Sequence, residues 1–503
     1  MRTLTRPPSS RTPARRLPAL LALALCTGLL RGGPCAAGDD DPLAGLSGDA
    51  ARALAAELAS DAMQGRKTGL PSARRHEDWV AQQMGDMGLH PKDPAGTYLD
   101  PFRFLVTHTS AASLSVGGKA LAFGPGFVDL SFSGSGEVEA EVVFVGYGIS
   151  RPDLGWDDYA GADVKGKVVL ALRGAPKARA AQLQQERQIG AKSSLAADRG
   201  AVGFLAVEGA KPVQGTIQGR FFRPGLPALW VASEPVDAWL AAAPGEGPRT
   251  VEAARAALDA EGAVPAAARP LGVRVRMAAT VEARADATGH NALGGIDGRD
   301  PALRGEVVIV GAHMDHLGVD PLGRTYNGAD DNASGAAVVL HLARLLKENR
   351  WRPKRTVLFV LFGAEEQGLV GSRHLAEGLP FEHESVVCVL NMDMVGRGTT
   401  EVTLAGVKRF APMGQRLLAS LPEGLRKQVV AEDDVGPWGD HWPFAEKGVP
   451  AFFLATRGEH PDYHTVDDDA ERLQPECMEA AARVLGTLLV RLGEDPAALK
   501  ELR

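Results

Sequence analysis

The sequence predicts an α/β fold in which helices flank a mainly parallel mixed sheet and a β-rich domain is inserted. Three apolar runs have the length of buried strands, at Glu306–Gly311, Arg355–Phe362 and Ser385–Asp393. Helical stretches such as Gly335–Glu348 separate them, and this alternation favours parallel strands with helices on both faces. From about Ala111 the pattern changes to short alternating strands, which indicates the inserted domain.

We expect four segments along the 503 residues. Five arginines, the apolar stretch 17–30 and the small residues Cys35-Ala36-Ala37 are typical of a secretory signal peptide. The segments are this signal peptide (1–37), the N-terminal part of the main domain (38–110), the inserted domain with a Pro- and Ala-rich connection (111–269), and the rest of the main domain (270–503). The signal peptide predicts a secreted or periplasmic protein. No segment is long enough to span a bilayer, so no membrane span is expected.

Within the N-terminal part, residues 48–87 are expected to be helical around a turn at GRKTGLPS. The formal charge of -7 is small for this length, and no basic run appears in the body of the chain, so nucleic acid is not an expected partner. Cys26 and Cys35 fall in the removed segment, which leaves Cys388 and Cys477 either as a disulfide or as buried thiols.

Five short segments carry side chains that can bind a divalent metal, and three of them directly follow an apolar run. They are His313 with Asp315 in GAHMDHLG, Asp331 in NGADDNASG, Glu365 and Glu366 in FGAEEQG, Asp393 in NMDMVG, and His464 in PDYHTVDD. In open α/β sheets, sites form outside the carboxyl ends of the strands, so these groups should converge. Two imidazoles and three carboxylates suffice for two zinc ions when one carboxylate bridges them, which predicts a two-metal hydrolase.

Two of these positions have a geometric interpretation. A step of two residues along extended chain puts Asp315 on the same side as His313, where its carboxylate can accept a hydrogen bond from the far imidazole nitrogen. Asp331 stands just before a helix, which is a rigid position for a bridging carboxylate. The other acids nearby, Asp330 and the run 467–469, are expected to face solvent or to cap helices.

The adjacent glutamates need separate roles. Consecutive residues beyond a strand point in different directions, so Glu366 can bind metal while Glu365 accepts the proton of the attacking water. Tyr463 is next to His464, and its hydroxyl could donate to the oxyanion that develops on the substrate carbonyl. Adjacency alone supports this last role.

The five motifs, in this order, resemble those of the M28 family of zinc peptidases. VFVGYGI followed by WDDYAGADVKGKVVLALRG resembles the family's protease-associated (PA) insert. The resemblance implies an aminopeptidase-like fold with two Zn²⁺ ions per chain. One ion would be held by His313, Asp393 and the bridging Asp331, and the other by Glu366, His464 and the same Asp331. It also implies that Glu365 is the general base of a metallo-aminopeptidase acting on peptide substrates.

Two other activities stay open. Relatives with the same metal core and the same insert cleave C-terminal residues, and Arg220 and Arg223 could bind a substrate carboxylate in a carboxypeptidase or dipeptidase. The other is an acyl transferase like the glutaminyl cyclases, which the insert disfavours. Because no ligand position is substituted, a non-enzymatic branch of the family is also disfavoured. The preferred side chain, the physiological substrate, the native metal and the oligomeric state have no signal in the sequence.

Overall fold

The computed structural model describes residues 41–212, 219–265, 267–379, 381–382 and 385–497. The expected signal peptide, with Cys26 and Cys35, lies outside these residues. Among the described residues, no helix combines the length and the apolarity that crossing a membrane requires.

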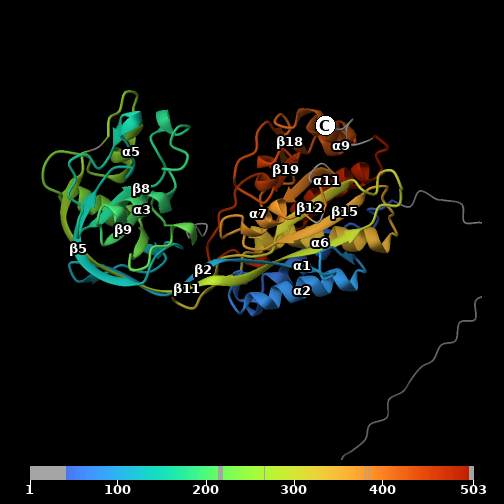
Figure 1. Ribbon diagram of the computed structural model, residues 1–503, viewed down its shortest axis with the longest axis horizontal. Coiled ribbons are helices and arrows are strands. Elements are labelled where there is room, and N and C mark those ends of the chain that lie inside the picture. The colour runs from blue at the N-terminus through green and yellow to red at the C-terminus, as the bar shows by residue number, and fades with distance from the viewer. Residues whose placement is uncertain (1–40, 213–218, 266, 380, 383–384, 498–503) are drawn as a thin grey trace, which may run out of the picture. The chain divides into compact units, whose positions relative to one another are not determined.

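A mixed, mainly parallel sheet forms the centre of the main domain, as the sequence predicts (Figure 1). Its strand order is β18 (Val429–Glu432), β17 (Val402–Ala405), β19 (Ala451–Thr456), β16 (Val386–Met392), β12 (Val307–His313), β15 (Thr356–Phe362) and β11 (Arg269–Ile296). The neighbours β19, β16, β12 and β15 are parallel, whereas β11 joins β15 and β17 joins β19 in antiparallel pairs. Both faces of the central strands are buried, which explains their continuous apolar runs.

Helices cover both faces of this sheet. Val308 and Val310 of β12 join one cluster of buried side chains, and Val307 and Ile309 join the other, because successive residues of a strand point to opposite faces. The first cluster includes α1 (Gly48–Leu58), α2 (Ala73–Asp86), α6 (Gly335–Glu348), α8 (Ala411–Ser420) and α11 (Pro475–Glu494). The second includes α7 (Val370–Glu377) and α10 (Trp442–Glu446).

A separate core of buried side chains extends from Leu114 to Met277. It is built on β5 (Gly136–Phe144), β8 (Val168–Leu172), β9 (Gly203–Val207), β10 (Ala228–Val231) and β4 (Phe127–Asp129), with α3 (Ile189–Asp198), α4 (Ser233–Ala242) and α5 (Val251–Asp259). We call the part of the chain with this core the insert. Figure 1 shows β2 (Leu99–Val116) and β11 running side by side, and they pair from Leu99 with Ala292 to Val116 with Val275.

Two features mark the C-terminal end of the insert. The Pro- and Ala-rich connection contains α5, and Thr250 caps this helix by accepting a hydrogen bond from the Ala253 N–H. The core also continues past residue 269 to Met277, because β11 begins in the insert and continues into the main sheet.

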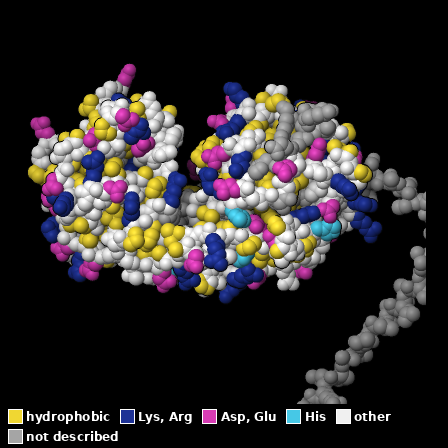
Figure 2. All heavy atoms as spheres, in the orientation of Figure 1, with side chains coloured by type: hydrophobic (Ala, Val, Ile, Leu, Met, Phe, Trp, Pro, Cys, Tyr) yellow, Lys and Arg dark blue, Asp and Glu magenta, His cyan; other side chains and the backbone are white. Residues whose placement is uncertain are grey.

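The shorter elements include η1 (Asp61–Arg66), β1 (His90–Pro91), β3 (Lys119–Ala120), β6 (Ser150–Arg151), β7 (Trp156–Asp157), β13 (Gly318–Val319), β14 (Thr325–Tyr326) and α9 (Glu423–Arg426). Cys388 on β16 and Cys477 on α11 are both buried free thiols. Figure 2 shows acidic and basic side chains interspersed over one face of the molecule, without a large area of one sign.

Candidate metal centre

The predicted ligands lie beyond the carboxyl ends of the parallel strands. His313 is the last residue of β12, Glu365 and Glu366 follow β15, and Asp393 follows β16 directly. Asp331 lies in the short helical segment Ala329–Ser334 before α6, and His464 lies in the loop after β19. The structure therefore brings all five predicted ligands to one edge of the sheet.

The first group of ligand atoms belongs to His313, Asp331 and Asp393. His313 Nε2 lies 3.2 Å from Asp331 Oδ1 and 3.5 Å from Asp393 Oδ1. All three side chains are buried, and their ligand atoms lie within 4.8 Å of one another. This is the set that the family resemblance implies for one ion.

The second group lies around the other oxygen of Asp331. His464 Nε2 is 3.0 Å from Asp331 Oδ2 and 3.1 Å from Glu366 Oε1, as expected for the second ion. The structure adds a residue that the sequence reasoning missed, because His316 Nδ1 also lies 3.0 Å from Glu366 Oε1. His316, Asp331 and Glu366 are all buried and close enough to share an ion. The sequence feature that could have identified His316 is that it is the second histidine in the motif GAHMDHLG.

These residues fit a pair of metal ions. Asp331 turns Oδ1 to one group and Oδ2 to the other, as a bridging carboxylate must. Asp393 Oδ1 is buried and has no hydrogen-bond partner among the described residues, so an ion would satisfy an otherwise costly acceptor. Imidazole nitrogen and carboxylate oxygen are the donor types that zinc sites use.

The adjacent glutamates lie in different environments. Ala364 has a left-handed backbone (φ 54°), and Glu366 is buried whereas Glu365 is partly exposed. Burial, together with the Asp440 and Glu366 carboxylates, raises the pKa of Glu365 well above its ordinary value. Burial also acts to raise the pKa of Glu366, but His464 and His316 lower it to about 2. Glu366 is therefore held ionised, whereas Glu365 has the higher affinity for a proton.

Asp315 acts on a different neighbour from the one expected. His313 Nδ1 lies 3.2 Å from the backbone oxygen of Asp315 and 3.7 Å from its carboxylate Oδ1. That carboxylate instead accepts a hydrogen bond from the backbone N–H of Glu365, at 3.1 Å. The expected geometry required an extended chain as far as Asp315. Because β12 ends at His313, the Asp315 side chain lies toward the Glu365 backbone instead.

Tyr463 stacks on His464, with ring centroids 3.8 Å apart and an angle of 16° between the rings. Its side chain is 44% exposed, so it borders solvent beside the buried ligands. Its contact with an oxyanion stays a prediction.

Two acids expected to face solvent or cap helices are buried beside the centre. Asp468 accepts hydrogen bonds from the backbone N–H groups of Asp330 and Asp331, at 2.9 and 3.0 Å. Asp330 accepts the N–H of Gly396 at 2.8 Å and lies 2.5 Å from His460 Nδ1. Asp468 thus holds the backbone of the bridging Asp331, a role that sequence reasoning missed because 137 positions separate them.

The arginines of the carboxypeptidase alternative make their contacts within the insert. Arg220 donates to Gln188 and lies over the Phe221 ring at 4.8 Å, and Arg223 pairs with Asp198 at 3.5 Å. No contact with a metal ligand is found for either arginine among the described residues.

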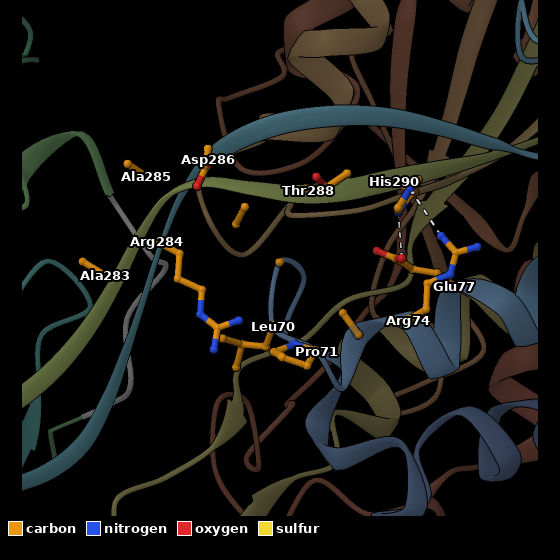
Figure 3. Close-up of a pocket in the computed structure, with 13 residues that line it drawn as sticks. Leu70, Pro71, Arg74, Glu77, Ala283, Arg284, Ala285, Asp286, Thr288 and His290 are labelled. Atoms are coloured by element: carbon orange, nitrogen blue, oxygen red, sulfur yellow. Dashed lines mark hydrogen bonds and ion pairs between the residues drawn. The ribbon is translucent and has the colours of Figure 1, made fainter.

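A hollow of about 650 Å³ lies between the start of α2 and the middle of β11 (Figure 3). Arg74 and Glu77 line one side, and Arg284, Asp286 and His290 line the other. Figure 3 shows His290 joined to Glu77 and Arg74, and the His290 Nδ1 to Glu77 Oε2 distance is 2.8 Å. The hollow includes none of the candidate ligands, so it is distinct from the metal centre.

The segment that carries the metal centre is similar to a known peptidase family. Residues 291–489 match the sequence model of peptidase family M28. This M28 segment contains all five predicted metal ligands and Glu365.

Curated proteins that are similar in sequence include aminopeptidases. The chain is 30% identical over 211 residues to aminopeptidase YwaD of Bacillus subtilis, a match that covers 39% of this chain and 44% of that protein. The chain spans about half the length of the curated relatives it matches.

Two solved structures share the fold over most of the chain. The aminopeptidase from Aneurinibacillus sp. strain AM-1 aligns with a TM-score of 0.62 at 21% identity, over 90% of this chain and 97% of that one. BSAP, a zinc aminopeptidase from Bacillus subtilis, aligns with a TM-score of 0.61 at 19% identity, over 91% and 98% of the two chains. The fold outside the M28 segment is therefore shared with both structures as well.

Proposed function

We propose that this protein is an exported aminopeptidase with two zinc ions per chain. The observation that carries the proposal is the position of Asp331, whose Oδ1 lies 3.2 Å from His313 and whose Oδ2 lies 3.0 Å from His464. A buried carboxylate shared by two groups of nitrogen and oxygen donors suits a pair of metals better than it suits a single ion. The named activity of YwaD and the match to family M28 support the same class of enzyme.

The residues around the centre suit peptide hydrolysis. Bound zinc would lower the pKa of the attacking water and polarise the substrate carbonyl. Glu365 accepts the proton of that water and passes it to the leaving amine, while Asp315 holds the backbone of Glu365 in place. We assign to the Tyr463 hydroxyl a hydrogen bond to the developing oxyanion, since its ring lies on ligand His464 at the solvent side.

Attack from the amino end fits the charge of the centre. Asp331, Glu365, Glu366 and Asp393 place four acids at the centre, which attract a protonated α-amine and repel a free carboxylate, although two zinc ions would cancel much of this charge. The arginines that a carboxypeptidase could use, Arg220 and Arg223, are engaged by Gln188 and Asp198 of the insert.

Two blocked peptides test the direction of attack. We expect acetylation of the N-terminus to stop cleavage and amidation of the C-terminus to leave it nearly unchanged, with products followed by mass spectrometry. Cleavage of the acetylated peptide with loss of activity on the amidated one would overturn the proposal in favour of a carboxypeptidase. Cyclisation of an N-terminal glutamine by protein with one metal ion would instead indicate the acyl transferase.

We further propose that the insert is a PA-like domain and that the N-terminal residues direct export. The motifs VFVGYGI and WDDYAGADVKGKVVLALRG support the first, and the arginines followed by an apolar stretch support the second. N-terminal sequencing of the protein recovered outside the cytoplasm should begin near Gly38. An intact Met1 in the active form would contradict export by this route.

A further inference from the structure

Arg66 is a fully buried arginine that connects the N-terminal part of the chain to the metal centre. Its Nε donates to the Met314 carbonyl at 2.9 Å, and its NH2 group donates to the Gly328 carbonyl at 2.8 Å. Its NH1 group donates to the carbonyls of Leu58 at 3.0 Å and Asn327 at 2.5 Å. One guanidinium therefore joins the end of α1 to two loops of the M28 segment.

Both of those loops carry predicted ligands. Met314 lies between His313 and the residues Asp315 and His316, and Gly328 lies three positions before Asp331. The planar guanidinium fixes the relative position of these backbone segments, because its donors point in set directions. Arg66 thus spans the two loops whose separation sets the distance between His313 and Asp331.

The charge of Arg66 is balanced by the centre itself. Among the described residues no carboxylate lies within ion-pair distance of Arg66, and its four acceptors are all backbone carbonyls. Burial lowers its pKa to about 10, so the group remains protonated at neutral pH, and Asp315, Asp468, Asp331 and Glu366 are the charges that favour its cation. An uncompensated buried cation is costly, and the acids of the centre act to favour the Arg66 cation.

The backbone around Arg66 packs closely against the backbone of β13. Gln64, Gly65 and Arg66 have successive left-handed φ values of 51°, 65° and 53°. A Cβ atom on Gly65 would lie 2.2 Å from the Gly318 carbonyl oxygen, so only glycine allows η1 to lie against β13. The turn therefore seats the guanidinium between the ligand loops and not in solvent.

We propose that Arg66 is a positioning residue that holds the two ligand loops in metal-binding geometry before the ions arrive. The inference rests on the proposed function in one respect, namely that the centre binds metal. Arg66 touches neither substrate nor the ligand side chains, and it acts through the backbone of residues 314, 327 and 328. Without it, the carbonyls of residues 314, 327 and 328 would lose the donor that they share.

A second buried arginine provides a matched control. Arg355 is also fully buried and donates to the carbonyls of Leu492, Asp495 and Ala497, and its Nε pairs with Glu306 at 2.7 Å. It precedes β15, at the edge of the sheet opposite the carboxyl ends where the ligands lie. Loss of Arg355 should therefore weaken the fold without changing the metal centre.

The test compares Arg66→Met, Arg66→Lys and Arg355→Met in the full chain. Zinc affinity is measured by competition with a chromophoric chelator, the absorption spectrum is measured after cobalt substitution, and unfolding of the metal-free protein is followed by circular dichroism. We expect Arg66→Met to lose roughly 10–100-fold in zinc affinity and to change the cobalt spectrum, the range found for groups that orient metal ligands. Arg355→Met should lower the unfolding temperature and keep the zinc affinity of the unmodified protein.

The outcomes separate a positioning role from a structural one. Unchanged zinc affinity in Arg66→Met, or an equal loss in Arg355→Met, would overturn the proposal. If Arg66→Met does not fold, Arg66→Lys decides, because lysine keeps the charge but cannot reach all four carbonyls. Its zinc affinity should fall, and unchanged affinity would overturn the proposal. Tight zinc binding without aminopeptidase activity would contradict only the proposed function, since these measurements do not use turnover.

Discussion

Replacing Asp331 by asparagine should remove both metal ions at once. The unmodified protein should carry about two zinc equivalents, because Asp331 turns one carboxylate oxygen to His313 and the other to His464. The amide keeps the size of the side chain but removes the charge that faces both His313 and His464. Elemental analysis of the purified variant should show less than about one equivalent, and its hydrolysis of peptides should fall below detection.

The control for Asp331→Asn is Asp467→Asn, in the loop that carries His464. Asp467 is 66% exposed and forms an ion pair with Arg472 at 3.8 Å, so its loss should leave the metal content unchanged. An Asp331→Asn protein that still holds two ions would show that the two groups do not share this carboxylate. One retained ion would mean that the second group is completed by His316 without Asp331.

The variants Glu365→Gln and Glu366→Gln should separate chemistry from metal binding. Glu365→Gln should keep both ions and lose about 10²-fold or more in turnover, the range expected for a missing general base. Glu366→Gln should instead lower the metal content, because Glu366 Oε1 lies 3.1 Å from His464 and 3.0 Å from His316. Metal content and turnover number measured on the same preparations distinguish the two effects.

These two substitutions are each other's control, since they make the same change at neighbouring positions. Equal loss of metal in both variants would mean that both glutamates are ligands. A nearly normal turnover number for Glu365→Gln would transfer the role of base to another acid, with Asp440 as the next candidate because its charge acts on Glu365.

The central sheet could be predicted because its signal is local. The strands β12, β15 and β16 are buried on both faces, so each is a continuous apolar run that differs from the helices beside it. The predicted ligands followed from the same signal, since a polar group after such a run lies at the carboxyl edge. His313 and Asp393 are found there.

The rest of the centre depends on contacts between distant segments. Asp468 supports Asp331 across 137 positions, and Arg66 reaches Gly328 across 262. Neither Asp468 nor Arg66 belongs to a periodic apolar pattern. Both occur in segments whose sequence suggests a turn or a solvated loop. The prediction for Asp315 failed for another reason. Residues two apart lie on the same side of the chain only within a strand, and β12 ends at His313.

The wide separation of the supporting residues sets the time at which the centre can be completed during synthesis. Arg66 and all the core residues of the insert, from Leu114 to Met277, precede His313 in the chain. About 400 residues separate Arg66 from Asp468, and their synthesis takes roughly 20–80 s at ribosomal rates. His464 and Asp468 follow the insert and the other predicted ligands in the chain, so the nascent chain has no complete pair of metal sites until these two residues have left the ribosome.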